Sequence, residues 1–269
     1  MHIKKIIFNF FVNKLSNVNS LFNKHKGEEC YIIGWGNSIK YIDLKLFNEK
    51  PVIGINEIIF HDDFQELKNK YVVHSEPFFY YPFFQTYSWK SPLFPIFAPT
   101  AKFFRKFIRS HKDTFFFIHL SNSIFLKGKN IFYNFLKYPN KEIKKKLGKI
   151  NPFKGAFNHA VSLAIFLGFK KVILVGCDYT FKPPTGNHFY EKGKGKKIDI
   201  EPYNLDFFNH VQKYIEIKTL TIDSRKSVLP KIDYFDLKKD RLNYKENFKI
   251  IEPKKLEALK NIRKGVYEF

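Results

Sequence analysis

Short apolar runs alternate along the chain with helical patterns, and small or polar residues follow most of these runs directly. Runs of this length and composition predict buried strands. We expect strands at 31–33, 51–60, 71–76, 114–119, 171–175 and 217–222. Strands that alternate with helices are typical of parallel sheets, so the pattern predicts an α/β fold.

The clearest unit lies at 155–190. Its apolar, alanine-containing stretch 156–167 predicts a helix buried on most sides, and Gly168 suits the left-handed residue that ends a helix. The strand 171–175 follows after a two-residue link. A helix followed by a buried strand is half of a βαβ unit, and ligands bind beyond the carboxyl ends of such strands.

We expect one Rossmann-like domain at 27–237, with a mainly parallel sheet flanked by helices. An amphipathic basic helix is predicted at 1–26, and a charged tail with a short helix at 238–269. Further helices are predicted at 39–47, 101–110 and 205–214. The stretch 77–99 is dense in proline and aromatic residues, which favours a lid or insertion, or else a wrap over the core.

The formal net charge of +22 indicates an anionic partner. An anionic membrane surface, an anionic ligand and nucleic acid are the three candidates. The sequence has no helix-turn-helix, zinc-finger or aromatic RNA-binding signature, so we expect no nucleic acid. We expect peripheral association with an anionic membrane, through the helix 1–26 and a second lysine-rich run at 133–149.

The compartment follows from smaller signals. Cys30 and Cys177 both adjoin apolar runs, which favours buried free thiols in a reducing cytoplasm. No apolar run approaches the roughly 20 residues of a membrane span. The N-terminal region lacks a small-residue cleavage site, so we expect no cleaved signal peptide. These features predict a cytoplasmic protein, peripheral at the inner-membrane face.

Several residues at the predicted sheet edge carry the chemistry of group transfer. The turn Gly34–Gly36–Asn37–Ser38 offers backbone N–H groups to an anion. His188 is a candidate base, because the ordinary pKa of histidine lies near 6.5. Tyr179, Tyr190 and the flexible lysine loop 192–197 could stabilise a leaving phosphate.

Other interpretations stay open. Asp178 is expected to orient His188, to bind a sugar hydroxyl, or only to cap a turn. His74 and His119 are second candidates for the base, and His159 is either a core histidine or a residue facing the cleft. We expect no metal site, because no Asp-x-Asp pair follows an apolar strand and no His or Cys spacing suits zinc.

The ordered segments IIGWGNSI, GINE, VVHSEP, GAFNHAVSLAIFLGFKKVILVGCDYTF and NHFYE resemble bacterial sialyltransferases of glycosyltransferase family 42, and equally the related MptE-like group. The resemblance covers roughly 28–225, and LGFKKVILVGCDYTF with HFY is its most specific part. It implies a metal-independent, inverting transferase that uses a CMP-activated sugar of the nonulosonic-acid type. The implied acceptor is a glycan or glycolipid of the bacterial surface, as in lipopolysaccharide or capsule biosynthesis.

The resemblance also implies residue roles. Gly34, Gly36, Asn37 and Ser38 would approach the nucleotide phosphate and sugar. Asn56 and Ser75 would contact the donor, and Gly155 and Ala156 would bring backbone to the cytidine. Catalysis would fall to His188 and Asp178, with Tyr179 or Tyr190 on the leaving phosphate.

Two other functions fit the sequence. An MptE-like pterin diphosphokinase would use ATP with Mg²⁺ and clustered carboxylates. A non-catalytic module would bind a nucleotide or glycan within an assembly. The chain could form a homo-oligomer in each of these functions.

Overall fold

The computed structural model describes residues 17–77, 79–80, 98–134, 155–199 and 205–260 of the chain. Its centre is an eight-stranded sheet of order β10-β8-β6-β1-β2-β3-β4-β5, in which each neighbouring pair is parallel. The strands are β1 (Glu29–Ile33), β2 (Val52–Ile55), β3 (Lys70–His74), β4 (Phe115–His119), β5 (Ile131–Asn134), β6 (Lys171–Val175), β8 (Glu216–Thr221) and β10 (Lys231–Asp233). This confirms the predicted α/β fold with a mainly parallel sheet.

The chain starts the sheet in its middle. It adds β2 to β5 on one side of β1 and then returns to place β6, β8 and β10 on the other side. The direction therefore reverses between β1 and β6. In open parallel sheets this reversal leaves a crevice beyond the strand ends, because the flanking connections run to opposite sides.

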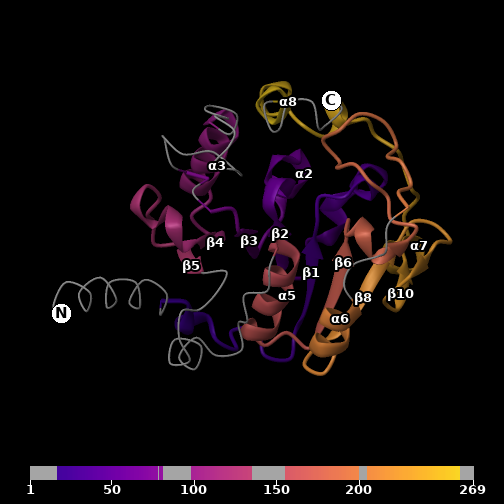
Figure 1. Cartoon of the computed structure of the whole chain (residues 1–269), viewed down its shortest axis with the longest axis horizontal. Helices are drawn as coiled ribbons and strands as arrows, with labels where there is room; N and C mark the ends of the chain where they lie inside the picture. The colour runs from indigo at the N-terminus through magenta and orange to yellow at the C-terminus, as the bar shows by residue number, and fades with distance from the viewer. Residues whose placement is uncertain (1–16, 78, 81–97, 135–154, 200–204, 261–269) are drawn as a thin grey trace.

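Helices surround the sheet, and Figure 1 shows α5 and α6 over one face of it. The α-helices are α2 (Asp62–Glu66), α3 (Ala98–Ser110), α5 (Ala156–Leu167), α6 (Leu205–Val211), α7 (Tyr234–Lys238) and α8 (Pro253–Lys260). Shorter 3₁₀ helices are η1 (Asn17–Leu21), η2 (Asn37–Tyr41), η3 (Leu44–Phe47), η4 (Asn56–Phe60), η5 (Leu120–Ile124), η6 (Asp178–Thr180) and η7 (Asn247–Lys249). None of the helices within these described ranges is long and apolar enough to cross a bilayer.

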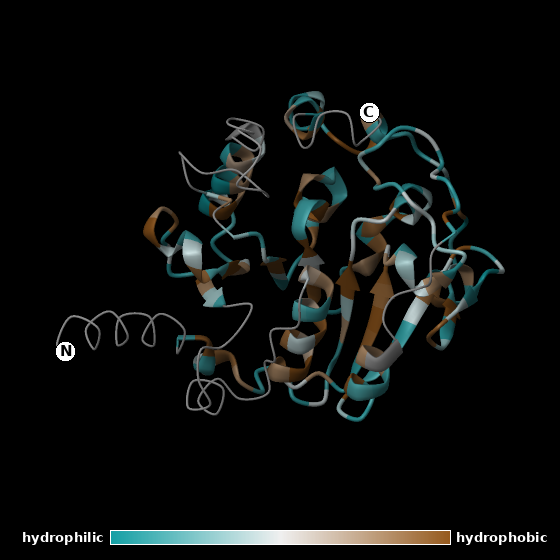
Figure 2. Ribbon diagram, in the orientation of Figure 1, coloured by the Kyte–Doolittle hydropathy of each residue, from teal (hydrophilic) through white to brown (hydrophobic). Residues whose placement is uncertain are grey.

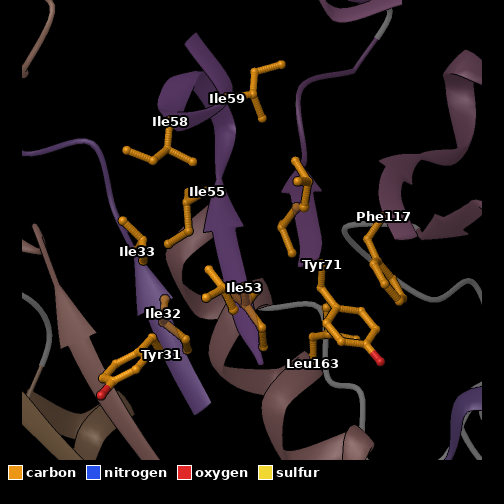
Figure 3. Close-up of a cluster of buried hydrophobic side chains, with 14 of the residues drawn as sticks. Tyr31, Ile32, Ile33, Ile53, Ile55, Ile58, Ile59, Tyr71, Phe117 and Leu163 are labelled. Carbon is orange, nitrogen blue, oxygen red and sulfur yellow. The ribbon is translucent and has the colours of Figure 1, made fainter. Parts of the chain in front are cut away.

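The core is built around the central strands and includes side chains of α5, α3 and η4. Strands at the middle of a parallel sheet are buried on both faces, so they consist of continuous apolar runs. Figure 2 shows these strands as hydrophobic elements with more hydrophilic segments around them. Figure 3 shows side chains from β1 to β4, η4 and α5 that share this core, with Leu163 of α5 beside Ile53 and Tyr71 of the sheet.

The predicted helix at 156–167 is confirmed as α5. Gly168 ends it in the left-handed conformation, with φ 87° and ψ 15°. Its N–H bonds back into the last turn of the helix, which leads the chain directly into β6. The strands predicted at 31–33, 71–76, 114–119 and 171–175 are also present, as β1, β3, β4 and β6.

Two predicted elements were too long. The strand expected over 51–60 ends at Ile55, because Asn56 takes a left-handed φ of 47° and begins η4. The helix expected over 39–47 is instead the pair η2 and η3. Ile42 is extended between them, and the Asp43 side chain accepts a bond from Lys45 N and so starts a new turn.

The shortest strands carry too little pattern to be predicted. β5 has four residues and β10 has three. The strand expected last, at 217–222, is present as β8, but β9 (Lys226–Ser227) and β10 follow it. β9 pairs antiparallel with β7 (Phe181–Lys182). The alternation in β10 is exposed, half-buried, exposed, so its sequence shows no hydrophobic face.

The ends of the described chain pack on the domain. Val18 and Leu21 belong to the core, although a helix through residue 26 was expected; η1 ends at Leu21 and turns follow it. Ile251 and Leu259 of the expected tail also belong to this core. The expectations for residues 1–16, and most of those for 77–99 and 133–149, fall outside the described residues.

His74 at the end of β3 is enclosed by aromatic rings. The ring centroids of Phe79 and Phe104 lie 4.3 and 4.4 Å from its own. Neither ring nitrogen has a hydrogen-bond partner in the described part of the chain, and burial lowers the pKa of His74 to about 3. This histidine is therefore neutral in the folded protein.

We expect the substitution His74→Leu to make the protein more resistant to acid. A lowered pKa means that the unfolded chain binds a proton that the folded protein does not, so stability present above about pH 6.5 is lost as the pH falls toward 3. Between about pH 7.5 and pH 5 one such histidine costs about 2 kcal/mol. Urea unfolding at both pH values should show a loss about 2 kcal/mol smaller in the variant than in the wild type. Equal losses in the two proteins would contradict the buried, neutral state.

Candidate active site

A cavity of about 400 Å³ opens at the carboxyl edge of the sheet, where the strand order reverses between β1 and β6. Its wall comes from the segments that follow β1, β2, β3 and β6 and from the start of α5. The lining residues are Gly34, Trp35, Gly36, Ile55, Asn56, Glu76, Gly155, Ala156, Phe157, Gly176, Cys177, Asp178, Tyr179, Thr180 and His188.

The cavity brings together most of the residues that the sequence predicts for the site. They are Gly34, Gly36, Asn56, Gly155, Ala156, Asp178, Tyr179 and His188. Four candidates are not among its lining residues, namely Asn37, Ser38, Ser75 and Tyr190. Three of these contact the lining: Asn37 and Tyr190 contact His188, and Ser38 contacts Asp178.

The glycine turn after β1 lies directly against the turn after β6. Gly34 N donates to Val175 O and Gly36 N donates to Gly176 O, both at 2.8 Å. A Cβ atom on Gly34 would lie 2.6 Å from Gly176 O, so only glycine allows this approach. These N–H groups were expected to face a phosphate; in this structure they hold the two turns together instead.

Asp178 joins the same two turns through its side chain. Its carboxylate accepts hydrogen bonds from Ser38 N, at 2.9 Å, and from the Ser38 hydroxyl. Burial raises the pKa of Asp178, while the bonds from Ser38 and the charge of Arg225 oppose that rise. Since Ser38 occupies both carboxylate oxygens, the geometry favours a positioning role for Asp178 over an orienting contact with His188.

His188 lies on a segment that crosses the glycine turn. Gly36 and His188 form an antiparallel bridge, and Phe189 N donates to Trp35 O at 3.0 Å. The His188 ring meets the Trp35 ring edge-on at a centroid distance of 5.6 Å. Backbone bonds therefore fix the segment, and the half-buried imidazole is left at the cavity wall.

Glu191 and Lys40 secure this segment from behind. The buried Glu191 carboxylate accepts bonds from His188 N at 2.7 Å and from Asn187 Nδ2 at 2.9 Å. The Lys40 ammonium is fully buried and donates to Glu191 O and to Gly193 O. Burial lowers the pKa of Lys40, and the nearby carboxylates of Glu246 and Glu191 oppose this. Two buried side chains thus bind the backbone of His188 itself and of the residues that follow it.

Residues beyond β10 complete this support. Asn247 Nδ2 donates to Tyr190 O at 2.7 Å, and Glu246 Oε2 accepts from Gly193 N at 3.3 Å. Tyr244 donates to the same Glu246 carboxylate at 2.7 Å. These residues were not predicted for the site, because the composition of 238–269 indicates only a charged tail.

The two tyrosines occupy different places. Tyr179 lines the cavity and is 40% exposed, and burial, with the charges of Glu191 and Asp178, raises its pKa. Its phenol therefore stays protonated at neutral pH and can donate a hydrogen bond. Tyr190 is buried, with its ring 5.1 Å from the His188 ring, so it packs behind the candidate base. Of the two, Tyr179 alone lines the cavity.

Asn56 presents an unused acceptor at the cavity. Its left-handed backbone ends β2, and its buried Oδ1 has no hydrogen-bond partner in the described part of the chain. Ser75 is turned to a different partner: its hydroxyl lies 2.9 Å from His159 Nδ1. Asn37 Nδ2 reaches the carbonyls of His188 and Gly193, at 3.5 and 3.3 Å.

The other candidate histidines are not among the lining residues. His119 Nδ1 lies 2.8 Å from the Ser121 hydroxyl, and burial lowers the pKa of His119 to about 4. Burial likewise lowers the pKa of His159 to about 3, so it is a neutral core histidine. These positions leave His188 as the candidate base at the cavity.

Several lining residues have no individual role predicted from the sequence, namely Trp35, Ile55, Glu76, Phe157, Gly176, Cys177 and Thr180. Most of them directly follow a strand, which was the available signal. Phe157 follows Gly155 and Ala156 at the start of α5, and an aromatic residue in an apolar helix predicts only a core position.

The described cavity wall contains no lysine or arginine, although the loop 192–197 was expected to contact a phosphate. Lys194 instead lies over the Tyr244 ring, 5.4 Å from its centroid. In the described ranges, no group of three or more His, Cys, Asp or Glu side chains is arranged to hold a metal ion.

No protein-family model matches the chain, and no curated protein matches it. Among solved structures it is similar to the Campylobacter jejuni sialyltransferase CstII with the substrate analogue CMP-3FNeuAc, at TM-score 0.46 and 15% identity over 87% of this chain and 99% of that chain. CstII with cytidine-5′-monophosphate gives TM-score 0.43 and 15% identity over 72% and 80%. CstII with a trisaccharide acceptor and CMP gives TM-score 0.39 and 16% identity over 71% and 80%.

Proposed function

We propose that the chain is a sialyltransferase-like glycosyltransferase. It transfers a sugar, of the nonulosonic-acid type, from a CMP-activated donor to a glycan or glycolipid acceptor of the bacterial surface. The observation that carries this proposal is the convergence at one cavity of motif residues far apart in the chain, from Gly34 through Asn56 and Gly155 to His188. The cavity also lies at the sheet edge where nucleotide-binding α/β folds hold their ligands.

The chemistry assigns one role to each side chain. His188 removes the proton of the acceptor hydroxyl as that oxygen attacks the anomeric carbon of the donor. The bond from this carbon to the phosphate oxygen breaks on the opposite face, so the configuration inverts. The Tyr179 phenol donates a hydrogen bond to the departing phosphate. The free Oδ1 of Asn56 accepts a bond from the donor.

The remaining candidates build the frame. Asp178 and Ser38 tie the glycine turn to β6, and Tyr190 packs behind His188. Trp35 and Phe157 form aromatic walls of the cavity. Gly155 and Ala156 expose backbone there, as a close approach to a nucleoside requires.

The proposal includes a location. The enzyme works in the cytoplasm at the inner face of the membrane, held by its positive charge and by the segment 1–26. Its acceptor would be presented at the same surface.

Thermal melting with nucleotides tests the donor. A ligand that binds only the folded state raises the melting temperature, by about 2.7 kcal/mol of stabilisation at a hundred times its dissociation constant. We expect a rise of about 5 °C or more with CMP and CDP, with or without Mg²⁺, and none with inorganic phosphate. A rise with ATP and Mg²⁺ alone would indicate a diphosphokinase instead. No rise with CMP, CDP, UDP, GDP or ATP would contradict the proposal.

A further inference from the structure

A second hollow, of about 410 Å³, lies between α3, η4 and α8. We call it the α3–α8 groove. α3 and α8 are in direct contact there, and the Thr100 hydroxyl donates to Ala258 O at 3.1 Å. Figure 1 shows both helices at the same end of the molecule. The groove does not include any residue of the candidate active site.

Three exposed lysines line this groove without a carboxylate partner. Lys102 and Lys106 lie one turn apart on α3, and Lys254 lies in the first turn of α8. None of the three forms an ion pair with a carboxylate in the described ranges. Like charges one helical turn apart repel each other, so this arrangement is unfavourable unless an anion binds between them.

The acids near the groove do not neutralise these lysines. Glu252 lines the groove, and Asp62 lies beside it, but both pair with Lys255, at 3.5 and 2.6 Å. Burial lowers the pKa of His111, so this lining histidine is neutral at pH 7. The groove therefore keeps the charge of Lys102, Lys106 and Lys254.

The floor of the groove is apolar. Ile59, Phe60, Phe103 and Phe107 form it, and Phe103 is the half-buried member that remains accessible. Cationic side chains around an apolar floor suit an anionic amphiphile, whose phosphate contacts the lysines while its hydrocarbon contacts the phenyl rings.

The groove is joined to the active-site cavity by a single short element. Asn56, at the start of η4, lines the cavity, while Ile59 and Phe60 at its end line the groove. A 3₁₀ helix rises about 2 Å per residue, so the two sites are separated by about 8 Å along η4. A membrane surface bound at the groove would thus lie beside the cavity.

We propose that the α3–α8 groove is a docking site for anionic membrane phospholipid, with Lys102, Lys106 and Lys254 binding the headgroup phosphate. The proposal extends the membrane part of the proposed function and does not depend on sugar transfer. It assigns membrane contact to the folded domain as well as to the segment 1–26.

Vesicle co-sedimentation of the full chain tests the site. The probes are vesicles of phosphatidylcholine alone and of phosphatidylcholine with about 30% phosphatidylglycerol. The test variant carries Lys102→Ala, Lys106→Ala and Lys254→Ala. The control carries Lys127→Ala, Lys129→Ala and Lys213→Ala, three exposed lysines elsewhere on the domain, and so has the same net charge. A third variant keeps the groove charge by replacing its three lysines with arginine.

We expect the groove variant to bind the anionic vesicles about a hundredfold more weakly, since each lysine at a membrane surface contributes about fivefold. The control and the arginine variant should bind like the wild type, and vesicles of phosphatidylcholine alone should bind none of them well. Equal binding by the groove and control variants would overturn the proposal, because attraction would then depend on net charge or on residues 1–26. Equal binding to both kinds of vesicle would also overturn it.

Two further measurements keep the outcomes separate. Melting of each variant with CMP reports the active-site cavity, so a loss of vesicle binding with an unchanged CMP response identifies the groove alone. The second measurement is binding of duplex RNA. If the wild type binds RNA, the groove variant does not, and neither prefers anionic vesicles, the groove belongs to nucleic acid and the lipid proposal is overturned.

Discussion

Replacing His188 by alanine is expected to lower kcat for sugar transfer by about a thousandfold, within the range of about 10² to 10⁴ that general-base catalysis contributes. The imidazole is at the cavity wall, while the backbone of the same residue is fixed by its bridge to Gly36 and by its bond to the Glu191 carboxylate. Truncation of the side chain leaves these backbone bonds in place. Stability should therefore change by less than about 1 kcal/mol.

The matched control is His210→Ala, which removes an exposed histidine of α6 outside the cavity. It should leave kcat unchanged. The rise in melting temperature with CMP should persist in His188→Ala, because the proposed base acts on the acceptor and not on the nucleotide. An activity equal to that of the wild type would remove His188 from the mechanism.

The sequence predicts the middle of the fold better than its edges. β1, β3, β4, β6 and α5 follow from apolar runs, because elements buried on both faces need continuous apolar sequence. The edge strand β10 has three residues and no buried face, so its pairing with β8 depends on the neighbouring backbone. A hydrophobic pattern cannot report a strand of that kind.

The candidate site shows the same division. Residues that directly follow a strand, such as Asn56 and Asp178, could be predicted because parallel strands deliver them to one edge. The partners of those residues could not be predicted. Ser38 and Asp178 are 140 positions apart, and their contact depends on how closely Gly36 passes Gly176. Local sequence does not encode such a distance.

The buried Lys40 illustrates what the charge pattern conceals. In a chain with 47 lysines and arginines, one more lysine in a predicted helix reads as a solvated residue. The structure instead buries it completely against the carbonyls of Glu191 and Gly193. The lysine loop that was expected to be flexible is thus connected to η2 through Lys40 and to the last part of the chain through Glu246.

Asp178 provides the second large expected effect, and it concerns stability. The substitution Asp178→Ala should destabilise the fold by about 3 kcal/mol, because it leaves the Ser38 N–H and hydroxyl without their acceptor in a buried site. The substitution Asp178→Asn should cost less than about 1 kcal/mol. The amide oxygen can accept from Ser38 N, and the amide nitrogen can donate to the Ser38 hydroxyl.

The pH dependence of the same pair has a defined sign. The pKa of Asp178 is raised in the folded protein, so the folded state binds this proton more tightly than the unfolded chain does. Stability of the wild type is therefore lost as the pH rises from the ordinary aspartate pKa, near 3.8, through the raised value. An asparagine side chain does not titrate, so the stability of Asp178→Asn relative to the wild type should increase across that window. Urea unfolding at several pH values measures this difference.

Activity of the same two variants separates positioning from direct catalysis. If Asp178 acts by holding Ser38 and the glycine turn, Asp178→Asn should keep kcat within about tenfold of the wild type, while Asp178→Ala loses considerably more. A loss beyond about a hundredfold in Asp178→Asn, with stability unchanged, would instead show that the negative charge acts on the substrate. The asparagine variant decides between these roles because it preserves the shape and both hydrogen bonds of the pair and removes only the charge.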